Sequence, residues 1–355
     1  MQNNLNEAKR YLISYLLIVL IGLSLLFFIS IYIQPLDGDL TRMGGYAEKD
    51  FGWNIPQEVL NSNIYLNKSY DKYYDIVVLG DSFSKHGLWQ SYFTENYNLT
   101  FTTLTWDSYT VEDILNNPVF YTNPPKIFII ESVVRLLPLR FSFHQECSVV
   151  NKPIYHDKWR LQQSEKKNLF VSKIRDTSFY WSKINLKFAL TYLENSFLRI
   201  FFKTDLSKVK NYSLTNTELF SNVRNNEILV LHTWFDSRAW KPGEILATIC
   251  VIGKIQNIVK SNGKTVFIFL LIPDKGTAYA DYIVNPEFTL LENIEQQMRD
   301  NNVNVPKLQN HLKNAIDSGI KDIYLPNDTH FGSKGYQLTA KALHELLLEL
   351  GVDLN

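Results

Sequence analysis

The feature that most constrains this chain is an uncharged apolar segment near its N-terminus. From Tyr11 to Ile33 the sequence runs for twenty-three residues without a charged side chain and is rich in Leu, Ile and Phe. A helix of this length extends about 35 Å, which is enough to cross the roughly 30 Å hydrocarbon core of a bilayer. We therefore expect one transmembrane helix at residues 11–33.

The flanks of this segment predict how the helix is retained and oriented. A cleaved signal peptide has a shorter apolar stretch of roughly 7–15 residues and a small-residue cleavage site, which Ser30 to Pro35 does not provide. Lys9 and Arg10 precede the segment, and Asp37 follows it. By the positive-inside rule, residues 1–10 stay in the cytoplasm. The rest of the chain is then expected in the periplasm or outside the cell, anchored in the inner membrane by a single span.

The rest of the chain has the composition of a globular protein. Of the 355 residues, 45% are apolar and 14% are aromatic, which is sufficient for a packed core. Lysine and arginine together number 36, as do aspartate and glutamate, so the formal net charge is zero. No long basic run is present, and nucleic-acid binding is not expected.

Two cysteines, Cys147 and Cys250, lie in the part of the chain expected outside the cytoplasm, where a disulfide can persist. The sequence leaves two alternatives open, a disulfide or two unpaired thiols with Cys250 buried in a helix. The seven histidines are scattered without zinc-ligand spacing, so neither a metal nor a cofactor is expected.

Apolar runs rich in β-branched residues alternate with helical patterns after residue 69. Strands are predicted at residues 74–79, 99–104, 126–130, 265–272 and 322–325. Helices are predicted at residues 82–93, from residue 111, at 243–261 and at 333–350. This alternation predicts an α/β fold with a three-layer, doubly wound parallel sheet of the flavodoxin-like kind.

Two regions fall outside this alternation. Residues 34–68 are expected to form a stalk that packs on a main domain spanning residues 69–355. Residues 138–240 have mixed character, with one amphipathic helix at residues 184–202, and we expect them to form an insertion that caps the sheet.

The segment Gly80-Asp81-Ser82 follows the first predicted strand and begins a helix. On such a tight turn the Ser82 hydroxyl would lie at the positive end of the helix, where the backbone N–H of Ser82 could help to bind an oxyanion. Alternatively, Ser82 only caps the helix N-terminus. Ser84 is expected to belong to the helix start rather than to act as a second nucleophile.

Asp328-Thr329-His330 follows the last predicted strand. In an extended segment the side chains of residues 328 and 330 point the same way, so Asp328 can orient the imidazole of His330. A serine hydroxyl becomes a strong nucleophile when such an imidazole accepts its proton. Ligands of parallel sheets bind at the carboxyl ends of the strands, and we therefore predict a triad of Ser82, His330 and Asp328. The alternative is a turn with exposed polar residues.

These motifs resemble the SGNH (GDSL-type) hydrolase superfamily over residues 70–345, and within it the alginate O-acetyltransferase branch. That branch carries Asp-Thr-His followed by an aromatic residue, here Phe331. A Glu and an Arg after a central strand match Glu131 and Arg135, and a Pro-x-Lys block followed by Tyr matches Pro273-Asp274-Lys275 and Tyr279. The serine-first order is that of ordinary SGNH esterases, whose Gly-x-Asn-Asp block the sequence lacks.

The resemblance implies roles for these residues. Ser82 would be the nucleophile, His330 the general base and Asp328 the residue that orients it. The oxyanion or substrate site would involve six further residues: Gly80, Asp81, Glu131, Arg135, Lys275 and Tyr279. For Glu131 and Arg135, a structural ion pair between the two is an alternative.

The resemblance also implies an activity, which is O-acetyl transfer without a cofactor. The serine would take an acetyl group as an ester and pass it to a hydroxyl of an exopolysaccharide or another envelope glycan. The acetyl group would be supplied through a membrane-bound O-acyltransferase partner. Trp159, Trp181 and Trp234 could stack on sugar rings, or they are buried between the insertion and the sheet.

Two other functions remain open from the sequence. A carbohydrate esterase or lipase would use the same triad with water as the acceptor. A non-catalytic polysaccharide-assembly protein would use Ser82 and His330 only structurally.

Overall fold

The structure is a computed structural model, and it describes residues 2–33, 37–58, 69–97, 99–141, 181–205, 207–232, 242–285 and 293–352. The chain divides into two compact units. Unit 1 comprises Met1–Asn54, Arg175–His232 and Leu325–Thr329. Unit 2 comprises Ile55–Ile174, Thr233–Tyr324 and His330–Asn355.

Unit 2 contains a parallel β-sheet of four strands. The strands are β1 (Ile76–Gly80), β2 (Phe101–Thr105), β3 (Ile127–Val133) and β6 (Val266–Ile272). They lie in the order β2-β1-β3-β6, so β2 is added on one side of β1 and the later strands on the other. Ligands of such sheets bind at the carboxyl ends of the strands, where the order reverses. In this unit that place is the end of β1, which Ser82 follows closely.

The strands form where the sequence is richest in β-branched and aromatic apolar residues. β1 reads Ile-Val-Val-Leu-Gly and is buried throughout, and all seven residues of β3 are buried as well. Strands buried on both faces are continuously apolar, whereas strands with one face in water alternate. Four of the five predicted strands are confirmed.

Helices pack on both faces of this sheet. On one face Phe128 of β3 shares a core with apolar side chains of α10 (Pro242–Lys260). On the other face Phe101 of β2 contacts Trp89 of α5 (Leu88–Tyr97), with ring centroids 6.1 Å apart. The other helices of unit 2 are α4 (Ser82–Lys85), α6 (Val111–Leu115), α7 (Pro118–Thr122), η2 (Val134–Leu136), α8 (Leu137–Phe141), α11 (Lys275–Ala278), η6 (Ala280–Tyr282), α12 (Ile294–Asp300), α13 (Leu308–Asp317) and α14 (Ser333–Glu349).

The fifth predicted strand, at residues 322–325, is wrong. Tyr324 makes only an isolated antiparallel bridge with Phe331. Asp322 has a left-handed backbone with φ of 55°, which interrupts an extended strand. The chain therefore turns back on itself after one bridge instead of joining the sheet.

The predicted helix at residues 82–93 is divided in two by Gly87. This glycine has φ of 66°, a left-handed conformation that glycine adopts without steric cost. The division separates the single turn that carries Ser82 from the longer helix α5. The predicted helices at residues 243–261 and 333–350 are confirmed as α10 and α14.

Unit 1 combines helices with a two-stranded antiparallel sheet. Its elements are α1 (Gln2–Tyr32), α2 (Asp39–Gly44), α3 (Glu48–Phe51), η3 (Trp181–Lys183), α9 (Leu186–Phe197), the π-helical turn η4 (Leu198–Phe202), β4 (Val209–Ser213) and β5 (Glu227–Leu231). Leu40, Phe51, Val209 and Leu229 form a small core between the short helices and the hairpin. The helix predicted at residues 184–202 is confirmed as α9 with η4. The hairpin was not predicted.

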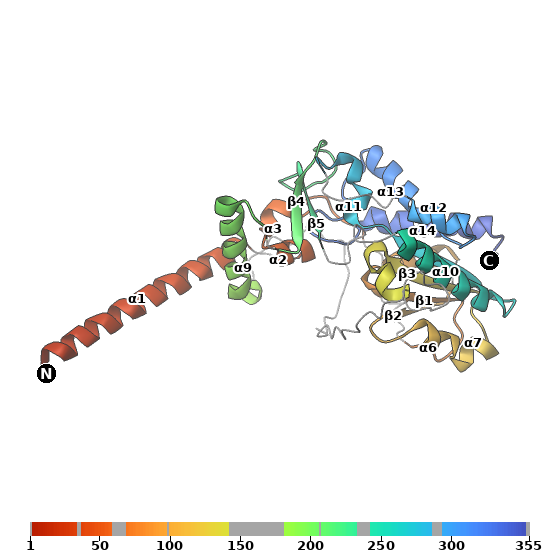
Figure 1. Cartoon of the computed structure of the whole chain (residues 1–355), viewed down its shortest axis with the longest axis horizontal. Coiled ribbons are helices and arrows are strands. Elements are labelled where there is room, and N and C mark those ends of the chain that lie inside the picture. Colours follow the sequence, from red (N-terminus) through yellow and green to blue (C-terminus); the bar gives the residue numbers. More distant parts are fainter. Residues whose placement is uncertain are drawn as a thin grey trace. The chain divides into compact units, whose positions relative to one another are not determined.

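Helix α1 is long and apolar enough to cross a membrane, by length and composition, over Asn6–Tyr32. It forms one long continuous helix (Figure 1), and most of its large apolar side chains are exposed. Its last turns are partly covered by α9. There Ile29, and Ile33 just after the helix, pack with Phe188 and Ala189 of α9. The expected N-terminal apolar helix is therefore confirmed as a helix of spanning length.

The compact units follow other boundaries than those expected from the sequence. Residues 37–54, expected to be part of a stalk, belong to unit 1. Residues 181–232, expected to be part of an insertion capping the sheet, belong to the same unit.

Cys250 lies on an exposed side of α10 and takes part in a disulfide. The alternative of a buried, unpaired Cys250 is therefore wrong. Cys147 lies outside the described residues.

A buried carboxyl group, that of Glu48, connects distant segments of unit 1. It accepts hydrogen bonds from the Thr41 hydroxyl at 2.5 Å, from the Gly38 N–H at 3.3 Å and from the side-chain amide of Asn327. Burial raises the pKa of Glu48 to about 7, although these hydrogen bonds act in the opposite direction. A Cβ at Gly38 would lie 2.1 Å from the Asn327 carbonyl oxygen, so this close approach requires glycine.

We predict that Glu48→Gln makes stability less dependent on pH. Because the folded-state pKa of Glu48 is raised, its contribution is fully present below the unfolded pKa of about 4.5 and is lost as pH rises through about 7. At 1.36 kcal/mol per pKa unit, the loss is about 3 kcal/mol. Thermal melting of the full chain in detergent at about pH 5 and about pH 8 measures it.

Glutamine keeps the shape of the side chain and stays neutral, so the melting temperature of Glu48→Gln should change less between the two pH values. Glu194→Gln, on the exposed surface of α9, is the control and should behave like the unmodified chain. An equal change of melting temperature with pH in all three proteins would contradict the raised pKa of Glu48.

Candidate active site

The turn that presents Ser82 is formed by the end of β1 and the start of α4. Gly80 is the last residue of β1, and Asp81 caps α4 by accepting the Phe83 N–H at 3.0 Å. A Cβ at Gly80 would lie 2.7 Å from both Glu131 Oε2 and Ser84 Cβ, so only glycine fits. Ser82 is the first residue of α4, and its N–H has no acceptor within that helix.

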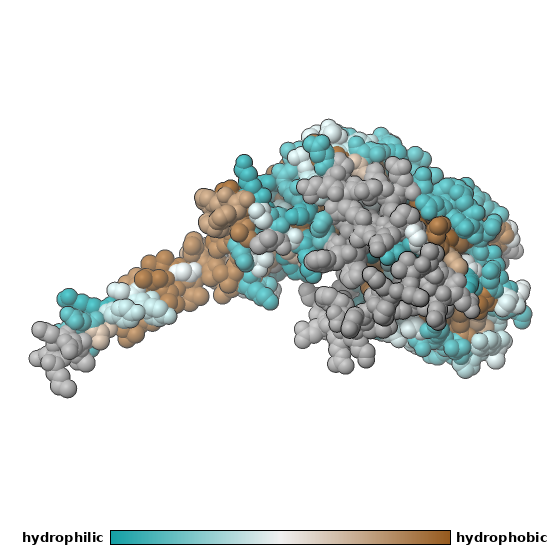
Figure 2. Space-filling model, in the orientation of Figure 1, coloured by the Kyte–Doolittle hydropathy of each residue, from teal (hydrophilic) through white to brown (hydrophobic). Residues whose placement is uncertain are grey.

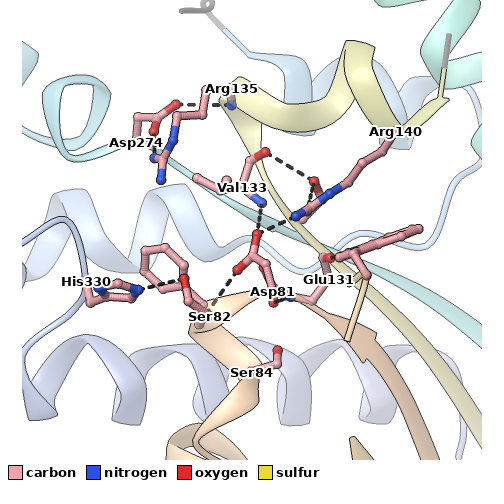
Figure 3. Close-up of polar contacts among 12 residues, drawn as sticks. Asp81, Ser82, Ser84, Glu131, Val133, Arg135, Arg140, Asp274 and His330 are labelled. Carbon is pink, nitrogen blue, oxygen red and sulfur yellow. Dashed lines mark hydrogen bonds and ion pairs between the residues drawn. The ribbon is translucent and has the colours of Figure 1, made fainter. Parts of the chain in front are cut away.

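The carboxylate of Asp81 connects the turn to the end of β3. Its Oδ2 accepts from Arg140 Nη1 at 3.0 Å and from the Val133 N–H at 3.3 Å, while Oδ1 caps α4. The guanidinium of Arg140 also donates to Ser132 Oγ at 2.7 Å. Figure 3 shows this carboxylate between the Ser82 turn and Arg140. Asp81 is therefore a support for the turn rather than a group open to substrate.

Glu131 supports the same turn from β3. It is fully buried, and its Oε2 accepts the Asp81 N–H at 2.8 Å. Burial, followed by the negative charge of Asp81, raises the pKa of Glu131 well above its usual value. Burial acts in the same sense on Asp81, but the Arg140 charge and the Phe83 N–H outweigh it and lower the pKa of Asp81. The negative charge of this pair is therefore favoured on Asp81 over Glu131.

Ser82 and His330 are brought together, as the sequence predicted. Ser82 Oγ lies 2.7 Å from His330 Nε2, and the two side chains point toward one another (Figure 3). The His330 ring is half-buried and packs on Phe83, the residue after the serine, with centroids 4.8 Å apart. An imidazole at this distance can accept the hydroxyl proton and make the serine oxygen a nucleophile.

An aromatic cluster holds the backbone next to His330. Phe331 packs on Phe83, Tyr324 and Tyr336, with ring centroids 5.0, 4.5 and 5.5 Å away. Together with the bridge between Tyr324 and Phe331, these contacts fix the residue that follows the histidine. The aromatic residue after Asp-Thr-His therefore has a packing role.

Asp328, the third predicted member of the triad, belongs to unit 1. Its Oδ2 accepts the backbone N–H of Asp39 at 3.2 Å. The carboxylate of Asp39 in turn accepts the N–H of Thr329 at 2.8 Å and its hydroxyl at 2.5 Å. Asp39 thus holds the residues that precede His330 in the chain. The contact between Asp328 and His330 stays a prediction.

Arg135 and Asp274 form an ion pair at the carboxyl ends of β3 and β6. The Arg135 side chain and its backbone N–H both bind the Asp274 carboxylate, the latter at 3.2 Å. The structure thus shows Asp274 as a partner of Arg135 and the Asp81 N–H as a partner of Glu131, while a pair between Glu131 and Arg135 stays an untested alternative. Figure 3 shows the pair on the side of the site that also carries Val133.

The remaining candidates lie elsewhere. Tyr279 is fully buried, and its hydroxyl accepts the Tyr324 N–H at 3.3 Å, while Lys275 is buried in α11. In this structure both are positioned to support the fold rather than to meet a substrate. Trp181 is 71% exposed in unit 1, which excludes its burial against the sheet. Trp159 and Trp234 lie outside the described residues.

Two contributors, Arg140 and Asp39, were not predicted from the sequence. Arg140 fell in the region expected to be an insertion, and Asp39 in the expected stalk. Each acts through a contact with a residue that is distant in the sequence. Such a contact leaves no local motif that could be recognised. A basic residue soon after the third strand was the only available signal for Arg140.

We predict that Arg140→Ala destabilises the chain and slows reaction at Ser82. Removing one member of a buried ion pair leaves an uncompensated charge on Asp81 and costs about 3 kcal/mol. Arg140→Lys retains a charge and should lose less. Thermal melting and the rate of labelling by a serine-directed fluorophosphonate measure the two effects.

The control is Arg224→Ala, which removes a more exposed pair with Glu227 at 3.3 Å. Such surface pairs contribute about 0–1 kcal/mol. If Arg140→Ala has the same melting temperature and labelling rate as Arg224→Ala, the ion pair of Arg140 with Asp81 does not support the Ser82 turn.

Comparison with known proteins assigns no family to this chain. No protein-family model matches it, and no curated protein matches its sequence. Its function is therefore inferred from the geometry and chemistry of the site itself.

Proposed function

We propose that this protein is a membrane-anchored O-acyltransferase that moves an acetyl group through an ester on Ser82 to a hydroxyl of an envelope glycan. The observation that carries the proposal is the 2.7 Å contact between Ser82 Oγ and His330 Nε2 at the carboxyl end of a parallel sheet. The strand order and the helices on both sheet faces are compatible with a three-layer SGNH-type fold.

In the first half-reaction Ser82 Oγ attacks the acetyl carbonyl carbon of an ester donor. His330 Nε2 accepts the serine proton as the new C–O bond forms. The tetrahedral intermediate collapses when the bond to the donor oxygen breaks, and His330 returns the proton to that leaving oxygen. The products are the acetylated serine and the free donor alcohol.

In the second half-reaction a sugar hydroxyl replaces the donor. His330 Nε2 takes the proton of this hydroxyl, whose oxygen attacks the carbonyl carbon of the serine ester; the bond from that carbon to Ser82 Oγ then breaks, and His330 returns the proton to Ser82 Oγ. The backbone N–H of Ser82 at the start of α4 would stabilise the negative oxygen of each intermediate. Asp328 would orient the imidazole through Nδ1.

The N-terminal helix supports the choice of a glycan acceptor and a membrane-bound donor. α1 is of spanning length, and the basic residues before it favour a cytoplasmic N-terminus. Acetyl-CoA is not available on the other side of an inner membrane. We propose that a membrane-bound O-acyltransferase supplies the acetyl group and that an exopolysaccharide receives it.

A second candidate, an SGNH-type esterase, is favoured by the same pair of residues. The contact between Ser82 and His330 activates water as readily as a sugar hydroxyl in the second half-reaction. The two functions differ only in the acceptor, so they are separated by measuring the product.

We predict that Ser82→Ala abolishes turnover of an acetyl ester by the full chain in detergent. Loss of the nucleophile of a serine and histidine pair lowers kcat by roughly a thousandfold or more. Ser84→Ala is the matched control, because Ser84 lies two residues later with its hydroxyl buried against Trp89 Nε1 at 3.1 Å. Turnover that survives in a folded Ser82→Ala protein would refute the proposal.

We also predict that oligosaccharides divert the acetyl group from water to sugar. The full chain is incubated with p-nitrophenyl acetate and a panel of neutral and uronic-acid oligosaccharides. Mass spectrometry should detect acetylated sugar that is absent with Ser82→Ala. Release of acetate with no acetylated sugar from any member of the panel would instead identify an esterase.

A further inference from the structure

The surface of unit 1 next to α1 presents apolar side chains to solvent along α9 and η4. Leu190, Phe197 and Phe201 are 53, 53 and 69% exposed and recur at helical spacing, so they form one stripe. The rings of Phe197 and Phe201 lie 4.7 Å apart. We use the name α9–η4 stripe for the exposed apolar residues of these two elements, which are Leu186, Leu190, Phe197, Ile200, Phe201 and Phe202.

Two polar side chains of the same segment, those of Asn195 and Arg199, face the protein, while Lys187 and Glu194 are exposed. Asn195 is buried and donates to the Gly44 carbonyl oxygen at 3.1 Å. Arg199 donates to the carbonyl oxygens of Gly44 and Gly45 at 2.8 and 2.6 Å. A surface helix of a water-soluble protein presents mainly polar residues outward, whereas the exposed residues of this segment are largely apolar. These hydrogen bonds also fix the orientation of η4, so its apolar side chains are held facing outward.

The stripe is continuous with the C-terminal end of α1. Ser30 of α1 accepts the Asn185 N–H at the start of α9 at 2.8 Å. Phe27 stacks with Trp181 at a centroid distance of 6.1 Å, and Ile29 packs near Phe188. Figure 2 shows the apolar surface of α1 continuing onto the neighbouring helix.

We propose that the α9–η4 stripe lies in the interfacial region of the bilayer that α1 crosses, in contact with phospholipid. This inference rests on the membrane anchor of the proposed function but not on its chemistry. The candidate span of 27 residues is about 40 Å long, which exceeds the roughly 30 Å hydrocarbon core. The last turns of α1 therefore lie at a membrane surface, and α9 is packed against those turns.

The charges around the stripe fit a lipid surface. Lys187 and Lys203 are exposed near its two ends, and Glu194 is the acidic residue of α9. Lysine side chains of interfacial helices extend toward phosphate groups while apolar side chains enter the acyl boundary. The stripe thus provides a second membrane contact beside α1, which fixes the depth of unit 1.

The test uses the full chain reconstituted in vesicles of phosphatidylethanolamine and phosphatidylglycerol. Benzoylphenylalanine, a photo-crosslinking amino acid, replaces Phe201 or, in a second variant, Ile200. Val223 is the control position, because it is 68% exposed in unit 1 outside the stripe. Leu20, in the middle of α1, reports whether the span is inserted.

After irradiation, mass spectrometry should find lipid adducts at Phe201 and Ile200 in several times the yield at Val223, together with adducts at Leu20. Adducts at Leu20 but not at the stripe would overturn the proposal, as would crosslinks from the stripe to a second copy of the chain. No lipid adduct at Leu20 would overturn it as well, because α1 would not be inserted. The Ser82→Ala chain should give the same adducts, so failure of the acyl-transfer chemistry is distinguishable.

Discussion

The arrangement of the candidate site depends on the ion pair between Asp81 and Arg140. Through this carboxylate the end of β1, the start of α4 and the end of β3 are connected within unit 2. Arg140 and backbone N–H groups compensate for the burial of Asp81 and lower its pKa, while burial and the Asp81 charge raise the pKa of Glu131 beside it. The turn that results presents Ser82 to His330 at the edge of the sheet where ligands of parallel α/β proteins bind.

The pair of Ser82 and His330 could be predicted because an apolar segment precedes each of them in the sequence. The β-branched apolar run before Gly80 is typical of a buried strand, and a serine shortly after such a strand lies at the sheet edge. His330 was also predicted to lie beside Ser82, which the structure confirms. The strand expected before it is absent, however, because residues 322–325 contribute one bridge and not a strand. A local apolar pattern reveals neither the left-handed backbone of Asp322 nor the close approach of Gly332 to its carbonyl oxygen.

The parts that the sequence did not predict all depend on contacts between distant segments. Arg140, Asp39 and Glu48 act on partners far away in the chain, and none belongs to a recurring motif. The hairpin of β4 and β5 has two five-residue strands that are only partly buried, which gives a weak periodic signal. Unit 1, assembled from the expected stalk and the expected insertion, was therefore not foreseen as a unit.

The proposed function requires Ser82 to be a nucleophile that is activated by His330. Reaction of the full chain with a fluorophosphonate, followed by peptide mass spectrometry, locates the modified residue directly. One adduct is expected on Ser82, formed much more slowly in His330→Gln and at an unchanged rate in Ser84→Ala. An unmodified Ser82 in the folded protein, or equal labelling when His330 is replaced, would contradict it.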